Sequence, residues 1–295
     1  MHRQLTNKVP ELLLLAILTG FFTMFVGPVV NGIAISFTDW NGLAFKYNYI
    51  GFSNYKAMFS DKRFLAAVTV TLWYAMILTV GGFILGYLAA YVVRCLRRTR
   101  SLIMTITFFP YMIMPVVACI IWNQMFGGLL PIIGKNLNIG WLQANLLAVP
   151  QSALFVVAAV DLWMLVPYVM LLLLAALNAI PEELMEYARL EGASWYQRLV
   201  HIELPYLNVA IGTLLIILLS YAMTHIDTLM TLTSGGPDHS TETIYYIIYK
   251  NSFVAQKYAF GLAESMTLST VCIVLLLAIN VMFNNRNLSD MGGPV

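Results

Sequence analysis

Six long apolar runs constrain this chain more than any other feature of its sequence. Each run is long enough to cross a hydrocarbon core of about 30 Å as a helix. Because 60% of the 295 residues are hydrophobic, a soluble domain of this size could not bury its apolar surface. We therefore predict an all-α integral membrane protein with one transmembrane domain over residues 1–295. The predicted spans are Pro10–Phe37, Ala66–Val93, Leu102–Phe126, Gln151–Asn178, Leu207–Thr233 and Gly261–Phe283.

The short loop between the second and third spans sets the predicted orientation. It reads RCLRRTR from Arg94 to Arg100, and short loops rich in Lys and Arg stay in the cytoplasm. Both termini then lie in the cytoplasm, as does the loop 179–206. The first run is too long for a signal peptide and lacks a small-residue cleavage pattern, so we expect it to remain in the mature chain. The three cysteines have neither disulfide nor metal-ligand spacing.

The loop 179–206 is unusually polar for this chain. Its central part reads IPEELMEYARLEGASWYQRLVHIELP, which predicts two short helices joined at Gly192. Glycine can end a helix by adopting a positive φ, and Ser194 with Gln197 has the spacing of a capping box for the second helix. The simpler alternative is an amphipathic interfacial helix that only connects two spans.

The same loop resembles the EAA loop of the permeases of binding-protein-dependent ABC importers. That pattern is E-A-A, three residues, G, nine residues and I-x-L-P, with Tyr187 standing here in place of the first alanine. The matching residues are Glu186, Ala188, Gly192, Ile202 and Pro205.

The resemblance extends over most of the chain. The stretches SFTDWNG, IGFSNYKAMFSDKRF, LAALNAIPEEL, LTSGGPDHSTETIYYIIYKNSF and GLAES are similar to the carbohydrate-uptake branch. Within that branch they resemble the first-permease type, which pairs with a second, different permease.

The resemblance implies a type I ABC importer permease fold and a coupling contact with an ATP-binding subunit. The residues it implies for this contact are Glu186, Tyr187, Ala188, Gly192, Ala193, Ile202 and Pro205. The implied partners are a second homologous permease, two ATP-binding subunits, an extracytoplasmic solute-binding protein, the lipid bilayer and a carbohydrate substrate, with no nucleic acid. The implied location is the plasma membrane of a prokaryote, as a multi-pass protein.

The chain lacks the phosphate-binding loop of an ATPase. The nearest sequence runs from Gly128 to Gly134 and Lys135, but it has five residues between its glycines and Asn136 after the lysine. We therefore expect no catalytic site, metal or cofactor in this chain, and ATP and magnesium in the partner ATPase subunits.

Polar residues in the outer halves of two spans predict a translocation pathway. On the fifth span they recur at three- and four-residue steps, which places them on one face of a helix with Tyr221 beside them. A carboxylate within a span usually faces the bundle interior or a wet cavity. The residues of the predicted pathway are Tyr221, Thr224, Asp227, Thr228 and Thr231 on the fifth span, with Asp161 and Tyr168 on the fourth.

Alternatives remain open both for these residues and for the whole chain. The hydroxyl groups could join neighbouring helices without touching a solute. For the whole chain, a permease for glycerol phosphate, a polyol or another small solute is the nearest rival. An ion-coupled secondary transporter, with Asp161 and Asp227 as proton or sodium sites, belongs to a different class.

Overall fold

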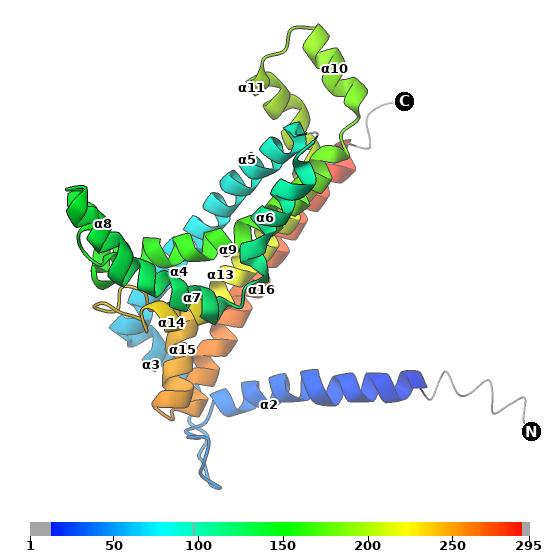
Figure 1. The fold of residues 1–295 in the computed structure, drawn as a ribbon. Coiled ribbons are helices and arrows are strands. Elements are labelled where there is room, and N and C mark those ends of the chain that lie inside the picture. The colour runs from blue at the N-terminus through cyan, green and yellow to red at the C-terminus, as the bar shows by residue number, and fades with distance from the viewer. Residues whose placement is uncertain (1–12, 97, 291–295) are drawn as a thin grey trace, which may run out of the picture. The chain divides into compact units, whose positions relative to one another are not determined.

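The computed structural model describes residues 13–96 and 98–290. Residues 10–12 of the first predicted span and Arg97 of the arginine-rich loop lie outside the described residues. The described residues form six helices that are long and apolar enough to cross a membrane, which confirms the predicted fold class. These helices are Leu13–Ser36, Lys62–Cys95, Pro115–Asn136, Pro150–Asn178, Asn208–Leu232 and Tyr258–Phe283 (Figure 1).

The chain divides into two compact units, and the smaller lies within Met1–Leu65 and Ile247–Thr270. Among its described residues, Gly32 allows a close approach of two helices, since an added Cβ would lie 3.1 Å from Cε of Met266. The Asn251 amide donates to both carboxylate oxygens of the buried Glu264, at 2.9 and 3.1 Å. The elements of this unit are a π-helical segment Phe22–Val26, α2 (Gly27–Ser36), α3 (Ser53–Ser60), a π-helical segment Lys250–Val254 and the first part of α16 (Tyr258–Asp290).

The larger unit lies within Ala66–Tyr246 and Val271–Val295 and contains all the candidate site residues. Its α-helices are α5 (Gly82–Cys95), α6 (Arg100–Met112), α7 (Pro115–Gln124), α8 (Leu130–Asn136), α9 (Pro150–Asn178), α10 (Glu182–Leu190), α11 (Trp195–Arg198), α12 (Leu204–Tyr206), α13 (Asn208–Thr224) and α14 (Asp227–Leu232). It also contains most of α4 (Lys62–Met76), the first half of α15 (Ile244–Tyr249) and the last part of α16. Its π-helical segments are Ile77–Gly81, Met125–Leu129 and Leu199–Glu203, and its 3-10 turns are Gly140–Leu142 and Leu146–Ala148.

Helix α9 forms the centre of the larger unit. It is apolar on nearly every side, as expected of a helix surrounded by others, and many of its side chains are buried. The closest neighbour is α5, where Gly86 lies so near that an added Cβ would be 2.5 Å from Cγ1 of Val169. The two helices therefore pack as one element, and any side chain at Gly86 would force them apart.

The third predicted span is wrong as a single helix over Leu102–Phe126. The structure has α6 and α7 there, separated by extended backbone at Ile113 and Met114. The cause is Pro115, whose ring disfavours a helical conformation of the preceding residue. The apolar helix that is long enough to span a membrane starts at Pro115 and ends at Asn136, ten residues beyond the predicted end.

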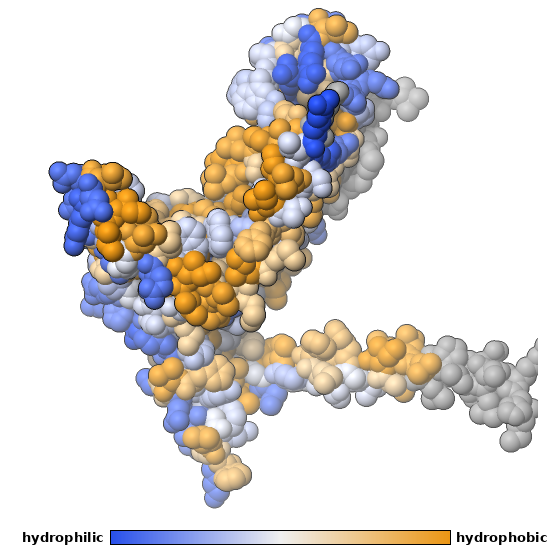
Figure 2. Space-filling view, in the orientation of Figure 1, coloured by the Kyte–Doolittle hydropathy of each residue, from blue (hydrophilic) through white to orange (hydrophobic). Residues whose placement is uncertain are grey.

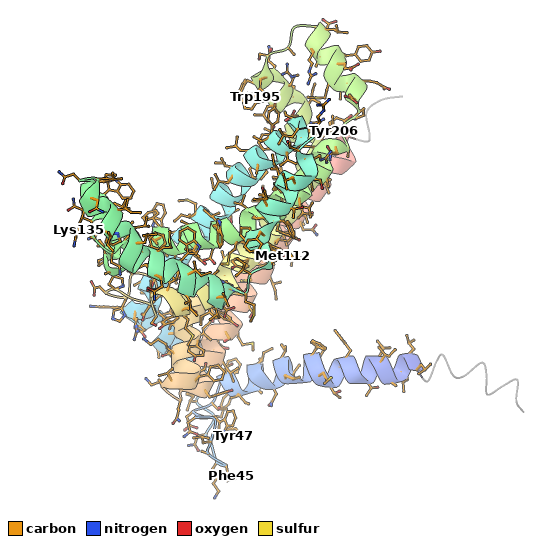
Figure 3. All side chains as sticks on the ribbon, viewed as in Figure 1. Phe45, Tyr47, Met112, Lys135, Trp195 and Tyr206 are labelled. Atoms are coloured by element: carbon orange, nitrogen blue, oxygen red, sulfur yellow. The ribbon has the colours of Figure 1, made fainter. Side chains whose placement is uncertain are left out.

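The surface of the larger unit separates apolar from polar regions (Figure 2). The exposed side of α6 carries Leu102, Ile106, Phe109 and Met112. Hydrophilic residues gather at the end that carries α10 and α11, where the side chains of Trp195 and Tyr206 also lie (Figure 3). This division fits a protein whose apolar flanks face lipid and whose loops face water.

Candidate functional site

The 179–206 loop folds into the two helices that its sequence predicts. Helix α10 ends in a Schellman motif, in which Ala193 N–H donates to the Ala188 carbonyl at 2.9 Å and Gly192 N–H to the Arg189 carbonyl at 3.1 Å. Gly192 has φ +76° there, and an added Cβ would meet nothing within 4 Å. Glycine is therefore needed for the backbone conformation and not for space.

The predicted capping box of the second helix is confirmed. The Ser194 hydroxyl accepts from Gln197 N–H at 3.3 Å, and the Gln197 side chain accepts from Ser194 N–H at 2.7 Å. After α11 the chain continues through the π-helical Leu199–Glu203 and α12 into α13, the fifth span. The loop is thus a compact pair of helices with local hydrogen bonds, not a single interfacial helix.

The loop presents apolar side chains outward. Tyr187, Leu190 and Tyr196 are 67%, 83% and 66% exposed, respectively. Exposed aromatic and aliphatic groups that gather on a polar surface typically mark a protein contact. Of the residues that the family resemblance places at the ATPase contact, Glu186, Tyr187, Gly192 and Pro205 are exposed, whereas Ala188, Ala193 and Ile202 are half-buried.

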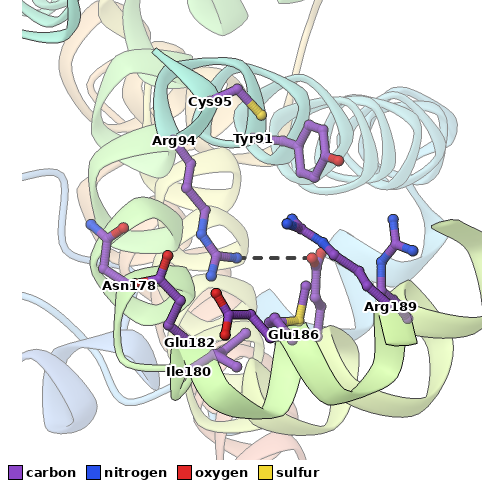
Figure 4. A pocket seen from close by; sticks show the side chains of 11 residues that line it. Tyr91, Arg94, Cys95, Asn178, Ile180, Glu182, Glu186 and Arg189 are labelled. Carbon is purple, nitrogen blue, oxygen red and sulfur yellow. Dashed lines mark ion pairs between the residues drawn. The ribbon is translucent and has the colours of Figure 1, made fainter. Parts of the chain in front are cut away.

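A cavity of about 450 Å³ lies between the loop and the end of α5 (Figure 4). Arg94 lines it from α5, and arginine and glutamate side chains line it from the loop. The dashed line in Figure 4 marks the ion pair between Arg94 and Glu203, whose Nη1 and Oε1 are 3.8 Å apart. The charged residues that line the cavity are Arg94, Glu182, Glu186, Arg189, Arg198 and Glu203. The charges of the two signs balance, so the cavity has no net preference for an anion or a cation.

The second candidate region, the predicted pathway on the fifth span, differs from its prediction. Helix α13 ends at Thr224, His225 has an extended backbone with ψ 133°, and α14 starts at Asp227. The prediction that the polar residues share one face of a single helix is therefore wrong, because the helical repeat does not continue across the break. Thr224 and Asp227 are exposed, Tyr221 and Thr231 are half-buried, and Thr228 is buried.

The break brings several polar side chains onto the buried carboxylate of Asp161. Its Oδ2 accepts from the Tyr74 hydroxyl, and its Oδ1 accepts from Tyr221 at 3.2 Å and from Thr228 at 2.6 Å. His225 Nε2 lies 2.9 Å from Oγ1 of Thr228 and 3.6 Å from Oδ1 of Asp161. We call these five residues the Asp161 cluster.

The Asp161 cluster changes the predicted role of two pathway residues. Asp161 and Thr228 are each fully buried and bonded to side chains of this chain. They hold α4, α9, α13 and α14 together at one point, so they do not line an open route in this conformation. The role of the exposed and half-buried pathway residues stays a prediction.

Tyr168 lies two helical turns further along α9 than Asp161. Its ring stacks on Tyr111 of α6, with ring centroids 5.5 Å apart and an interplanar angle of 11°. Tyr111 is exposed and Tyr168 half-buried, so the stacked pair offers aromatic surface on the larger unit. Sequence reasoning did not find Tyr111, because no local pattern links it to Tyr168.

Three further functional candidates also escaped the sequence reasoning. Tyr74 and Tyr87 lie within apolar helical runs, where a tyrosine gives no local sign of its hydrogen-bond partner. Glu203 occupies the unspecified position of the I-x-L-P pattern. The bond from Tyr87 to Glu203 joins residues 116 positions apart, a distance over which single-sequence patterns carry no information.

Comparisons with known proteins agree with this architecture. The chain is 31% identical over 244 residues to the "Multiple sugar-binding transport system permease protein MsmF" of Streptococcus mutans, covering 83% of this chain and 84% of that protein. It is 29% identical over 257 residues to the "sn-glycerol-3-phosphate transport system permease protein UgpA" of Shigella flexneri, covering 85% of both chains.

The fold has a close counterpart among solved structures. A chain of a bacterial ABC transporter involved in the import of the acidic polysaccharide alginate superimposes with a TM-score of 0.79 and 22% identity, covering 96% of this chain and 99% of that chain. Residues 82–289 match the family described as "Binding-protein-dependent transport system inner membrane component". The chain belongs to this family and is a multi-pass membrane component of a binding-protein-dependent transport system.

Proposed function

We propose that this chain is one of two unlike permease subunits of an ATP-driven importer for a sugar or oligosaccharide in the plasma membrane of a prokaryote. The single observation that carries the proposal is the 179–206 loop, a compact two-helix element with an outward apolar surface at one end of the spans. In this arrangement two ATP-binding subunits lie below the spans and hold ATP and magnesium. A solute-binding protein delivers the substrate from the other side.

The loop is suited to transmit force from a partner. The Schellman motif and the capping box satisfy its helix ends locally, so it can keep its shape while it moves as a body. Tyr187, Leu190 and Tyr196 offer apolar surface for a groove on the ATPase, and Glu186 adds a charge beside them. The residues proposed for the contact remain Glu186, Tyr187, Ala188, Gly192, Ala193, Ile202 and Pro205.

The orientation follows from the arginine-rich loop after α5. Positive charge at short loops is retained in the cytoplasm, and the 179–206 loop lies at the same end of the larger unit as Arg94. This placement puts the loop on the side where ATP is available, with both termini on that side.

Three features support a sugar as substrate. The Streptococcus mutans relative is named for multiple sugars. The stacked pair of Tyr111 and Tyr168 provides an aromatic face of the kind that packs on sugar rings, and Thr224 and Asp227 add exposed oxygens for hydroxyl groups. Substrate contact by Tyr221 and Thr231 belongs to the same proposal. Asp161 and Thr228 are buried, so their proposed role is indirect. Asp161 accepts hydrogen bonds from Tyr221 and Thr228 and would hold Tyr221 in position.

A glycerol phosphate permease is the second candidate, because the Shigella flexneri relative is named for that substrate. Phosphate recognition calls for Arg or Lys. Helices α9, α13 and α14 contain neither residue type, and α6 carries only Arg100 at its first residue, about three turns before Tyr111. This composition favours an uncharged solute. An ion-coupled secondary transporter is disfavoured, since the Asp161 carboxylate already accepts hydrogen bonds from three side chains of this chain.

The test is reconstitution with the second permease and the ATP-binding subunits of the proposed importer. Thermal-shift screening of the binding protein of the proposed importer against mono-, di- and trisaccharides and glycerol 3-phosphate names the ligand, and uptake of that labelled ligand is then measured in liposomes. We expect uptake that needs ATP and all subunits, and a loss of at least about tenfold with Glu186→Lys at the motor contact. Uptake by this chain alone under a proton or sodium gradient would refute the proposal.

A further inference from the structure

We propose that Glu203 is a positioning residue for coupling, which fixes the 179–206 loop to α5 through Tyr87 and Arg94. Movement of the loop is then passed to the second span as well as along the chain into the fourth and fifth. This inference rests on the proposed function, and it assigns a role to a position that the I-x-L-P pattern leaves unspecified.

The environment of Glu203 differs from that of the other glutamates in the loop. It is 2% exposed, whereas Glu182, Glu183, Glu186 and Glu191 are exposed. A carboxylate is buried at this depth only where charged or hydrogen-bonding partners compensate for the lost water. Here the Tyr87 hydroxyl donates to Oε2, and Arg94 Nη1 lies 3.8 Å from Oε1.

Both partners come from α5. Tyr87 is buried, and Arg94 is in the last turn of the helix, with 23% of its side chain exposed. Arginine near a helix C-terminus also interacts favourably with the helix dipole. The pairing therefore joins the middle of α5, at Tyr87, and its last turn, at Arg94, to the last residue of the π-helical segment Leu199–Glu203.

A second contact joins the same two elements. The rings of Phe83, Tyr87 and Tyr91 follow one another along α5 at four-residue steps, with centroids 6.5 and 6.3 Å apart. Tyr91 then meets Trp195, the first residue of α11, edge to face at 6.4 Å. Helix α5 therefore contacts the segment 195–203 near both of its ends, at Trp195 of α11 and at Glu203 of the π-helical segment.

The first loop helix has a different relation to α5. Helix α10 faces Tyr91, Arg94 and Cys95 of α5 across the cavity of about 450 Å³ (Figure 4). This open space leaves room for α10 to shift under a motor subunit. At Glu203 a hydrogen bond and an ion pair join the loop to α5, in addition to the ring contact at Trp195, so a shift of the loop can reach α5 there.

Helix α5 is packed closely enough to transmit a shift of the loop to α9 and α13. Gly86 packs it against Val169 of α9, and at Gly82 an added Cβ would lie 3.4 Å from Cδ1 of Leu218 on α13. Packed helices move together, because interiors of this density do not deform continuously. Glu203 thus links the loop to a helix that contacts both the fourth and the fifth span.

The experiment uses the assembled transporter with Cys119→Ser and Cys272→Ser, so that the exposed Cys95 is the remaining thiol of this chain. The readout is the rate at which N-ethylmaleimide labels Cys95, with and without ATP plus vanadate, together with the rate of ATP hydrolysis. Without Glu203 substitution we expect ATP plus vanadate to change the labelling rate at least about fivefold.

We expect Glu203→Ala to abolish this response while ATP hydrolysis and the amount of assembled complex stay within about twofold of wild type. Glu203→Gln retains an acceptor for Tyr87 but loses the charge opposite Arg94, so it should give an intermediate response. Tyr87→Phe should weaken the response in the same direction. The double variant Tyr87→Phe with Glu203→Ala should reduce the Cys95 labelling response no further than Glu203→Ala alone, because both substitutions remove the same hydrogen bond.

Glu183→Ala is the matched control, since Glu183 is an exposed glutamate of the same loop and should leave the response unchanged. If Glu203→Ala prevents assembly, the Cys95 labelling responses of Glu203→Gln and Tyr87→Phe test the proposal instead. A normal Cys95 response in both would overturn the proposal, as would an unresponsive Cys95 with Glu203 intact. A complete complex that never hydrolyses ATP would instead refute the proposed function, and the coupling role with it.

Discussion

The 179–206 loop and the Asp161 cluster are both polar regions of an apolar chain, but they satisfy their polar groups in different ways. In the loop, the groups that cap the helices lie within five residues of their partners, as at Ser194 and Gly192. In the cluster, one carboxylate accepts from residues 60 to 87 positions away. The loop is exposed to water, whereas Asp161 is fully buried.

This difference indicates how each region should respond to change. Loss of a bond in the loop exposes a polar group that water can satisfy, so the cost is small and local. Loss of Asp161 leaves buried donors on several helices without an acceptor, so the cost is large and shared. Glu203 is the exception within the loop, because its partners are distant and its carboxylate is buried.

The largest effect on stability is expected from Asp161→Ala. Hydroxyl groups of Tyr74, Tyr221 and Thr228 lose their acceptor in a buried site, and each buried donor left without a partner costs about 1–3 kcal/mol of the free energy of unfolding. Thermal unfolding of the purified transporter in detergent measures the loss. Asp161→Asn keeps an acceptor oxygen and should lose less, while equal melting temperatures for all three proteins would show that the cluster does not hold the helices together.

A smaller and local effect is expected from Gly192→Pro. Proline cannot adopt φ +76° and removes the N–H that donates to Arg189, which costs about 3 kcal/mol within the turn. Hydrogen exchange in α10 should speed up and ATP-driven uptake should fall, while insertion into the membrane and the melting temperature of the spans stay the same. Asn tolerates a positive φ, so Gly192→Asn is the control that should behave nearly as wild type. Equal uptake by the proline variant would remove the turn from the mechanism.

Ser194→Ala should have a still smaller effect. It removes the acceptor for Gln197 N–H at the start of α11, and loss of such a cap costs about 1 kcal/mol. Faster hydrogen exchange confined to the first turn of α11 is the expected result, and Ser194→Asp, which retains a capping oxygen, should restore protection. Unchanged exchange in Ser194→Ala would mean that the packing of Trp195, not the cap, holds this turn.

The least effect on stability is expected from cysteines placed on the fifth span, where the readout is reactivity. In a background without the native thiols, Thr224→Cys should react quickly with a small hydrophilic thiol reagent added from outside, because Thr224 is exposed. Met223→Cys and Thr228→Cys, at buried positions, should react slowly. A dependence of the Thr224→Cys rate on substrate and ATP would support the pathway assignment, and equal rates at all three positions would contradict it.

Local sequence was sufficient for much of the loop. Glycine at 192 and the Ser194 and Gln197 pair each specify a helix end through bonds to near neighbours, so their geometry could be predicted without the rest of the chain. The same is true of the apolar runs, where length alone indicates a span. The prediction of the third span as one helix failed, because the hydropathy of an apolar run does not show where a proline interrupts the helix. Here the interruption lies at Met114 and Pro115.

What the sequence by itself determined is therefore the helical membrane fold, the approximate spans, the two-helix loop and the family to which the loop belongs. Tertiary structure alone decided which polar residues within the spans meet. It placed Thr228 against Asp161 after a break at His225, and it brought Glu203 to Tyr87. The physical reason is range: capping and helix length depend on neighbours in sequence, whereas a buried carboxylate takes whichever donors the packing of distant helices supplies.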